Sequence, residues 1–491
     1  MHYLSRYFKH SLVIIYLIIF TFLLASKLIN QPTPFYDWDE SIYAQVGREM
    51  VKNKSIVPLW QGQIWLDKPP FVPLFYGLVL NSTQFVMPEI SMRLATLMLA
   101  LIVLAMIYWL YYRITKDVFI STLTVILTST TSIFLQRSQV GNIDVFLLLG
   151  WLGYLTFYKR RVIAFLFLTV AVMSKSLVGF YPIAIMLAYY FYLFYSKKIK
   201  KKELLAEIKI MLIQSGILLL WYVFMLIKYG RAFFIQHIIE SHAKRVTASI
   251  ESHFGKRTFY IDILFEHFGI YSWSALFGFG LIIYQWFKKL LKIDEVLYAS
   301  YLLPWFLFLN LTKTKIFWYG YPYIPQIVFL MFYPLTIIKK YLARPIYIGV
   351  CLIIAGLLIK NYFVDKKVYA KQYSSYEDYH RVAQYARDRC DKLYVLVEPN
   401  EREAKATLKK MDLLITTSLW WGNHPSMVYY FGRDIEYVYT IDRWSEVMNA
   451  TERSSCLVVS EEDKLLVPLS NTQTIIKYGN FYLFRFIKDY V

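Results

Sequence analysis

Apolar residues are gathered along this chain in nearly uncharged runs of about 20 residues, the length that an α-helix needs to cross a lipid bilayer. The first run spans 11–28. Further runs lie at 92–112, 118–136, 143–158, 162–174, 177–195, 209–228, 268–287, 296–312, 319–338 and 345–362. The pattern predicts a polytopic, all-α membrane domain over residues 1–362, with about 11–13 transmembrane helices and a long first outer loop at 31–91.

Composition agrees with a membrane protein and changes how the charge is interpreted. Hydrophobic residues make up 57% of the chain, against about 45–50% in soluble domains. The net charge of +20 would also suit a nucleic-acid-binding protein. The lysines, however, cluster between apolar runs, and cytoplasmic loops of membrane proteins collect Lys and Arg. The charge therefore favours membrane topology, with no nucleic-acid partner.

Every second loop between the runs is basic, which fixes an expected orientation. These loops carry Arg113 and Lys116; Lys159, Arg160 and Arg161; Lys197, Lys198, Lys200, Lys201 and Lys202; Lys288, Lys289 and Lys292; and Lys339, Lys340 and Arg344. Arg6 and Lys9 precede the first run, which is expected to stay uncleaved. We expect a multi-pass protein of the inner (plasma) membrane with a cytoplasmic N-terminus. An odd number of spans places the C-terminal segment outside the cytoplasm.

The C-terminal segment, residues 363–491, is predicted to be a small soluble α+β domain. A helix is expected at 374–389, and strands at 392–397, 412–417, 427–431, 436–440, 456–460 and 474–486. Cys390 and Cys456 would form a disulfide in an oxidising compartment, and two unpaired buried thiols are an equal alternative. The segment contains no catalytic motif.

The first outer loop contains three neighbouring acids, Asp37, Asp39 and Glu40, followed by an amphipathic helix. Asp37 is explained as a helix N-cap and Glu40 as its capping-box partner. Asp39 has no such role, and a surplus carboxylate beside a bilayer is a candidate for function. Further along the loop, two prolines hold Asp67 and Lys68 in a rigid turn. An isolated exposed ion pair contributes only about 0–1 kcal/mol, which gives no reason for that rigidity.

Later outer loops add more ionisable groups to the same face. Asp144 begins a span, where an acid could equally serve only to stabilise the helix N-terminus. Lys175 ends the next span and could simply extend its amine to the interface. Half of the eight histidines lie in one stretch, where carboxylates on the same face could join them as metal ligands: His237, His242, His253 and His267. Arg245 and Lys315 complete the set.

This mixture of charges suits a phosphate-bearing substrate on a lipid anchor. Cations bind a phosphate, and carboxylates act as bases or metal ligands. Apolar helices would hold the lipid. The cytoplasmic loops, by contrast, contain basic runs without acids in fixed motifs.

The motifs, in this order, resemble those of the GT-C glycosyltransferases that use polyprenyl-phosphate sugars, and the branch most similar is the aminoarabinose (lipid A) transferase and protein mannosyltransferase superfamily. The resemblance covers about residues 35–330. Its pieces are Asp39–Gln45 with Arg48–Met50, Asp67–Pro70, Asn142–Asp144, Ser174–Gly179, His242–Arg245 with His253, and Lys315–Pro325. Each piece is weak alone, and their common order and face make the signal specific.

The resemblance implies roles for individual residues. Catalytic carboxylates would be Asp39, its partner Asp144 across the cavity, and Glu40. The donor phosphate would be bound by Lys68, Arg245, Lys175 and Lys315. Asp67 and His242 match a pair that binds a divalent metal in the aminoarabinose branch. Asp67 stands where that branch usually has Glu, and Ile42 where it often has Arg.

The expected function is an inverting transfer of a monosaccharide from a polyprenyl-phosphate carrier to an extracytoplasmic acceptor. The expected acceptor is lipid A or another envelope glycolipid, or a protein hydroxyl. An alternative is a transporter or flippase for lipid-linked glycans, which predicts charges buried at mid-membrane and paired broken helices. A non-enzymatic membrane scaffold is the third hypothesis, and it leaves the outer-face acids unexplained.

Overall fold

The computed structural model describes residues 10–449, 454–468, 470 and 472–486; Arg6 and Lys9, used above for orientation, lie outside them. The chain forms two compact units. The first, here called the helical unit, comprises Met1–Gln31, Arg93–Gly230 and Gly255–Lys371. The second, the mixed unit, comprises Pro32–Met92, Arg231–Phe254 and Gln372–Val491. The predicted outer loop at 31–91 therefore shares a unit with the C-terminal segment, and so does 231–254.

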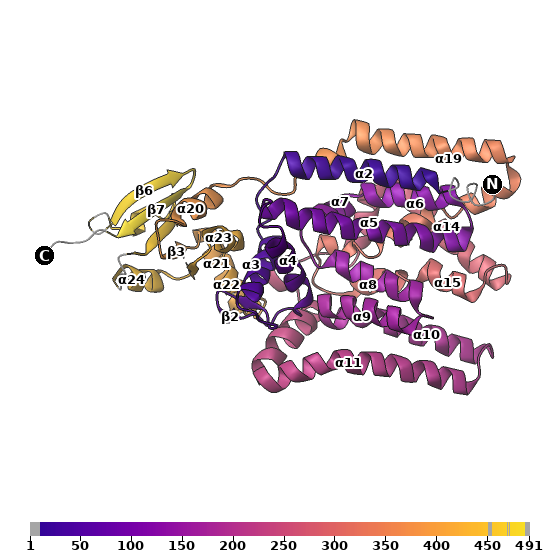
Figure 1. The fold of residues 1–491 in the computed structure, drawn as a ribbon, viewed down its shortest axis with the longest axis horizontal. Coiled ribbons are helices and arrows are strands. Elements are labelled where there is room, and N and C mark those ends of the chain that lie inside the picture. The colour runs from indigo at the N-terminus through magenta and orange to yellow at the C-terminus, as the bar shows by residue number, and fades with distance from the viewer. Residues whose placement is uncertain (1–9, 450–453, 469, 471, 487–491) are drawn as a thin grey trace. The chain divides into compact units, whose positions relative to one another are not determined.

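Long helices dominate the helical unit, and several run alongside one another in Figure 1. Those that begin in the first half of the chain are α2 (Ser11–Asn30), α5 (Pro88–Thr115), α6 (Val118–Thr130), α7 (Ser132–Gln139), α8 (Asp144–Phe157), α9 (Arg161–Lys175), α10 (Tyr181–Tyr195) and α11 (Lys201–Phe233). The later ones are α13 (Phe259–Phe268), α14 (Ser272–Phe287), α15 (Ile293–Ser300), α16 (Leu303–Leu311), α17 (Ile324–Phe332), α18 (Leu335–Tyr341) and α19 (Arg344–Ile359).

Six helical segments of the described chain are long and apolar enough to cross a membrane, or seven if the bent pair α6–α7 forms one span. They are Ser11–Asn30, Pro88–Thr115, Arg161–Tyr195, Lys201–Thr247, Phe259–Phe287 and Arg344–Asp365. The protein is thus a multi-pass membrane protein. The expected count of 11–13 transmembrane helices stays a prediction. The runs at 162–174 and 177–195, expected to be two spans, fall within the single segment Arg161–Tyr195. Those at 296–312 and 319–338 are divided among shorter helices.

Small residues let the helices of the helical unit approach closely. α8 packs along α9, and a Cβ added to Gly150 of α8 would lie 2.7 Å from the Ala171 Cβ and the Phe167 carbonyl oxygen of α9. α14 packs on α17 in the same way, because Gly278 leaves room for the carbonyl of Leu330. Membrane helices associate through such contacts, since water does not drive their apolar faces together.

The mixed unit is built around a five-stranded sheet in the order β4–β3–β5–β7–β6. β4 (Asp434–Val438), β3 (Lys392–Leu396) and β5 (Cys456–Ser460) are parallel, and β7 (Phe481–Phe486) and β6 (Thr472–Tyr478) are antiparallel. Around it lie α20 (Asp378–Ala386), α21 (Pro399–Lys410), α22 (Ser418–Trp421), α23 (Pro425–Phe431) and α24 (Ile441–Asn449). The core includes Leu396, Leu457 and Phe484.

The C-terminal α+β fold is confirmed, with corrections to its elements. The strand predicted at 427–431 is wrong, because this stretch belongs to α23: Pro425 begins that helix, and Gly432 ends it with a φ of +72°. The stretch 412–417 forms turns instead of a strand. The run 474–486 is two strands joined at Gly479, whose φ is +50°. Cys390 and Cys456 form a disulfide, which settles the alternative left open by the sequence.

The loop part of the mixed unit contains α3 (Asp39–Lys52), β1 (Leu59–Trp60), β2 (Gln63–Ile64) and α4 (Phe71–Ser82). α3 and α4 pack against each other at two glycines. A Cβ added to Gly47 of α3 would lie 2.2 Å from the Pro73 carbonyl oxygen and 2.7 Å from the backbone nitrogen of Gly77, both in α4. The contact is backbone against backbone, so no side chain can move aside to relieve it.

We therefore predict that Gly47→Ala destabilises the mixed unit, by about 1–3 kcal/mol for overpacking of a tight contact. Denaturant unfolding of the protein in detergent would measure the change. Gly216→Ala in α11 is a matched control, because no atom of the described residues lies within 4 Å of its added Cβ. Equal stability of the two variants would show that the α3–α4 contact tolerates separation.

Candidate functional site

The start of α3 differs from the capping arrangement expected from the sequence. Trp38 occupies the N-cap position, and no side chain makes a cap hydrogen bond there. Asp37 instead accepts hydrogen bonds from Ser426 and pairs with His424, so its interpretation as an N-cap is wrong. Asp37 therefore binds residues nearly 390 positions away in the sequence and not the backbone of its own helix. The neighbouring acid Glu40 is fully buried, and its Oε2 accepts the backbone N–H of Tyr36 at 2.6 Å.

Asp39 is the first residue of α3 and is partly exposed. Local hydrogen bonds hold the start of the helix. The Ser41 hydroxyl donates to the carbonyl oxygens of Asp37 (2.9 Å) and Trp38 (3.1 Å). The Ile42 N–H also donates to the Trp38 carbonyl at 3.0 Å. The backbone on both sides of Asp39 is therefore fixed by hydrogen bonds.

Glu49, near the end of α3, determines how the chain reaches Asp67. This buried carboxylate accepts the backbone N–H groups of Gln61 (2.8 Å) and Gly62 (2.9 Å) in the turn of the β1–β2 hairpin. Both turn residues have positive φ, at 51° and 74°. The Trp65 N–H closes the base of the hairpin on the Pro58 carbonyl at 2.9 Å. α3 thus positions both Asp39 and the segment that carries Asp67 and Lys68.

Asp67 and Lys68 form an ion pair of 3.0 Å in which Asp67 is only 6% exposed. The pair is therefore not the weak exposed kind, and removing one partner of a buried pair costs about 3–5 kcal/mol. Ser241 also donates a hydrogen bond to Asp67. Burial acts to raise the pKa of Asp67, but the charges of Lys68 and Arg245 outweigh it and hold that pKa below its ordinary value.

The residues around Asp67 come from a π-helix, η2 (Phe234–Ala243), and the short helix α12 (Lys244–Thr247) that follows. Such wide turns are frequent at functional sites. The Nδ1 of His237 donates to the Leu66 carbonyl at 2.9 Å, which ties η2 to the residue before Asp67. This contact brings Arg245, on α12, into the same cluster. The predicted phosphate ligands Lys68 and Arg245 are thus gathered around Asp67, although they are far apart in the sequence.

The C-terminal segment also contacts the stretch 240–251, which carries Arg245. The carboxylate of Glu240 accepts the Thr416 backbone N–H at 2.9 Å and its hydroxyl at 2.7 Å. Lys244 pairs with Asp412 at 2.7 Å. Glu251 lies 3.7 Å from Arg245 and also accepts from a serine of α22. Arg245 is therefore presented by a loop that is anchored at both ends.

The helical unit contains a separate buried cluster around Asp144. Asn142, not Asp144, caps α8: its Oδ1 accepts the N–H groups of Asp144 (2.9 Å) and Val145 (3.1 Å). Lys175 does not reach for an interface but donates to Asp144 Oδ1 at 2.6 Å. Arg137 lies 3.9 Å from Oδ2, which has no hydrogen-bond partner among the described residues.

Aromatic rings complete this cluster. The guanidinium of Arg137 lies 4.4 Å from the centre of the Trp318 ring, and the Lys175 amine lies 4.3 Å from that of Tyr319. Two cations therefore surround one carboxylate in an apolar setting. Such an excess of buried positive charge favours an anionic ligand.

Lys315 is placed differently from the other predicted phosphate ligands. It is 4% exposed, and its amine donates to the carbonyl oxygens of Leu309 (2.8 Å) and Asn310 (3.0 Å). These groups end helix α16, where a cation is favoured by the unpaired carbonyls. Lys315 thus has a structural use, and its phosphate role stays a prediction.

Asp67 and His242, the pair expected to bind a metal, differ in whether their polar atoms are available. Among the described residues, the Nε2 of His242 is buried without a hydrogen-bond partner, as a metal ligand requires. Asp67, however, is already engaged by Lys68 and Ser241. No group of three His, Cys, Asp or Glu side chains in the described part of the chain could hold a metal. A catalytic zinc site usually has three protein ligands, so these residues do not fit such a site.

Solved structures share the fold of the chain. ArnT from Cupriavidus metallidurans bound to undecaprenyl phosphate matches with a TM-score of 0.62 and 14% identity, covering 98% of each chain. The Archaeoglobus fulgidus oligosaccharyltransferase in complex with Zn and sulfate matches with a TM-score of 0.56 and 12% identity, covering 91% of this chain and 68% of that one. The chain has the GT-C fold. The fold expected from the motifs is confirmed, although no family model and no curated sequence matches the chain.

Within this GT-C fold, the sequence identified most of the charged groups but not their partners. Ser241 and His237 lay in the loop already singled out, and no spacing rule indicated their contacts. Arg137 carried a usable signal, because an arginine at the edge of an apolar run needs an anionic partner. The pairing of Asp37 with His424 had no sequence signal at all.

Proposed function

We propose that this chain is an inverting glycosyltransferase that takes a monosaccharide from a polyprenyl-phosphate carrier. The observation that carries the proposal is the convergence of Lys68 and Arg245 on Asp67, in the same unit as Asp39. Two cations around one carboxylate suit a phosphate ligand. The GT-C fold supports the same class, and one matching structure holds undecaprenyl phosphate.

In this reaction the acceptor oxygen attacks the anomeric carbon of the sugar. The bond between that carbon and the phosphate oxygen breaks, and the polyprenyl phosphate leaves from the opposite face. Lys68 and Arg245 stabilise the negative charge that grows on the departing phosphate. Asp67 holds the Lys68 amine in place through their ion pair.

Asp39 takes the proton if the acceptor is a hydroxyl. Glu40 is less suited to this role because it is fully buried and accepts a backbone N–H. Asp144 is less suited because Lys175 and Arg137 already neutralise it. The acceptor is a lipid A-type glycolipid or a protein hydroxyl on the extracytoplasmic side. A phosphate acceptor, already ionised, would need no base.

Buried charges and one bent helix pair are features that a transporter would also have. Arg137, Asp144 and Lys175 are buried charges, and α6 and α7 form one pair bent by 71°. A transporter with internal repeats is expected to have two broken helices in corresponding positions. Only one such bent pair occurs among the described helices. The three charges also lie at or near helix ends, where a fixed site can be built without broken spans.

The role of Asp39 is tested by Asp39→Asn, which keeps the shape of the side chain but removes the base. We expect turnover to fall by a factor of about 10² or more, as for a lost general base. Donor binding should persist, since Lys68 and Arg245 remain. The measurement is sugar transfer in proteoliposomes with a purified lipid-linked donor. Glu40→Gln should be milder, because an amide oxygen still accepts the Tyr36 N–H.

The opposite pattern would reassign the site. Near wild-type transfer by Asp39→Asn together with an inactive Asp144→Asn would make Asp144 the catalytic carboxylate. Transfer by both variants would exclude Asp39 and Asp144 as the base and contradict the proposed catalytic role of Asp39.

The phosphate site is tested by Lys68→Ala and Arg245→Ala. Each should weaken donor binding by about 1.5–3 kcal/mol, the range for hydrogen bonds to a charged group. Binding of the lipid-linked donor in detergent would be measured directly. Lys244→Ala is a matched control, because this neighbour of Arg245 pairs with the exposed Asp412. Unchanged binding at Lys68 and Arg245 would move the phosphate to another site, with the Lys175 cluster as the next candidate.

The orientation of the chain is part of the proposal. The basic loops predicted from the sequence support a cytoplasmic N-terminus and a C-terminal segment outside the cytoplasm. The Cys390–Cys456 disulfide supports this, since such bonds persist in oxidising compartments. Alkaline phosphatase fused after Lys366 should therefore be active. An inactive phosphatase with a fluorescent cytoplasmic reporter at the same point would reverse the orientation.

A further inference from the structure

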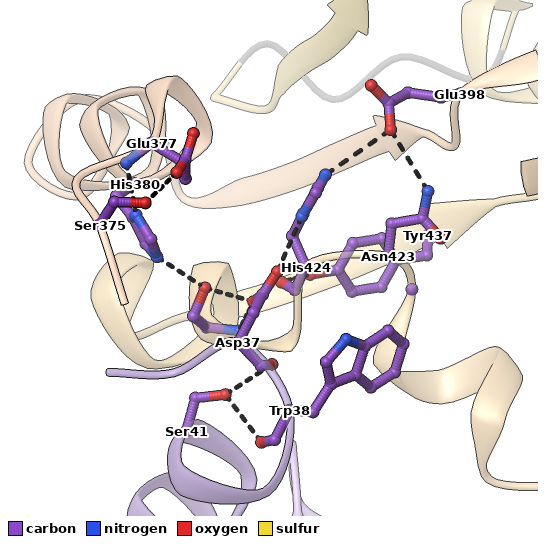
Figure 2. A network of polar contacts seen from close by, with 12 residues as sticks. Asp37, Trp38, Ser41, Ser375, Glu377, His380, Glu398, Asn423, His424 and Tyr437 are labelled. Carbon is purple, nitrogen blue, oxygen red and sulfur yellow. Dashed lines mark hydrogen bonds and ion pairs between the residues drawn. The ribbon is translucent and has the colours of Figure 1, made fainter. Parts of the chain in front are cut away.

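The C-terminal segment contacts the start of α3 through a compact polar network (Figure 2). One oxygen of Asp37, Oδ1, accepts the backbone N–H of Ser426 at 3.0 Å and its hydroxyl at 2.5 Å. The other, Oδ2, accepts from the Nδ1 of His424 at 2.8 Å. We call these three residues the Asp37 bridge. Both carboxylate oxygens of Asp37 thus accept hydrogen bonds from residues in the first turn of α23 or just before it.

A second layer orients the donors of the bridge. His380 is buried, and its Nδ1 accepts the Glu377 N–H at 3.1 Å, so a neutral ring carries its proton on Nε2. That nitrogen lies 3.0 Å from the Ser426 hydroxyl, which is thereby left to donate its own proton to Asp37. Burial lowers the pKa of His380 to about 4, which keeps the ring neutral. The direction of each hydrogen bond is therefore fixed.

His424 carries the positive charge of the bridge. Its other nitrogen, Nε2, lies 3.7 Å from Glu398, and the Tyr379 ring stacks on it with a centroid distance of 3.7 Å. Burial acts to lower the pKa of His424, but the hydrogen bond to Asp37 and the negative charges of Asp37 and Glu398 outweigh this and raise it to about 9. The titratable groups around the ring are Asp37, Glu398, Tyr379, Tyr437 and His380.

The bridge stands two residues before Asp39, and nothing in α3 itself caps the helix with a side chain. The same region is held by further contacts from the C-terminal segment. The Tyr430 hydroxyl accepts the Phe35 N–H at 2.8 Å, and Arg48 donates to the Tyr429 carbonyl at 3.1 Å. The position of Asp39 thus depends on α23 as well as on the local hydrogen bonds of its own helix.

We propose that the C-terminal segment positions the carboxylate of Asp39 for reaction, through the bridge in which His424 and Ser426 hold Asp37. The inference rests on the proposed function of Asp39. His424 and Asp37 are positioning residues: they touch neither the sugar nor the phosphate. A displacement of about 1 Å at a reacting group can lower a rate by about 10²-fold, so loss of the bridge acts on turnover rather than on donor binding.

The test compares His424→Gln and Asp37→Asn with the wild-type protein in the same transfer assay. Each variant should lower kcat about 10-fold or more while the KM for the donor stays within about twofold. Asp463→Asn is the matched control. Asp463 is 5% exposed and accepts from both terminal nitrogens of Arg402, at 2.7 and 3.0 Å. The variant therefore loses a buried ion pair of the same segment that contains none of the three bridge residues. The control should lose stability and keep its kcat.

A second measurement does not depend on activity. Amide hydrogen exchange of residues 36–43, corrected for its intrinsic pH dependence, should be faster in His424→Gln than in the wild type. In the wild type this protection is complete below about pH 6.5, the ordinary pKa of histidine, and is lost as the pH rises through about 9. Protection is lost with rising pH because the protonated His424 ring is the form that pairs with Asp37, and the ring loses its proton as the pH passes its raised pKa. His424→Gln should show no such transition.

The outcomes separate the two claims. Faster exchange at 36–43 with reduced kcat supports positioning. Unchanged exchange in His424→Gln, or an equal loss of kcat in Asp463→Asn, overturns it. If the wild type transfers no sugar, the proposed function fails, and the exchange result alone then decides whether the bridge holds the start of α3.

Discussion

A carboxylate can be buried only if it is paired or hydrogen bonded, and the mixed unit depends on this constraint. Asp37, Glu49, Asp67 and Glu240 are each satisfied by a segment other than their own. Asp37 and Glu240 are bound by the C-terminal segment, and Glu49 by the β1–β2 turn. Removing any of these partners would leave a buried or half-buried carboxylate without its partner, so the segments form one cooperative structure despite their distance in sequence.

This arrangement separates the residues proposed for chemistry from those that place them. Asp39, Lys68 and Arg245 carry the chemistry in our proposal. The carboxylates around them make structural contacts, and the C-terminal segment, which has no catalytic motif, supplies most of the partners. Within the helical unit, by contrast, α8 with α9 and α14 with α17 are held by close packing at small residues.

The sequence predicted the membrane class, the GT-C fold and the location of the C-terminal α+β segment, because apolar run length, loop charge and motif order are local signals. It also named Lys68 and Arg245 around Asp67, and Lys175 beside Asp144, but it missed Arg137. It failed where a distant partner decided the outcome. Asp37 had every local feature of a helix cap and binds His424 instead. Met427–Phe431 had the apolar residues of a strand, and Pro425 with Gly432 made it a helix.

The central claim is that this chain consumes a polyprenyl-phosphate sugar. Mass spectrometry of lipids and envelope proteins from cells with and without the gene tests it most directly, because it does not require the sugar or the acceptor to be known. We expect the deletion strain to accumulate one polyprenyl-phosphate sugar and to lose the same sugar from a glycolipid or a protein. Restoring the wild-type gene, but not an Asp39→Asn copy, should reverse both changes. Identical lipid and protein profiles in the two strains would contradict the claim.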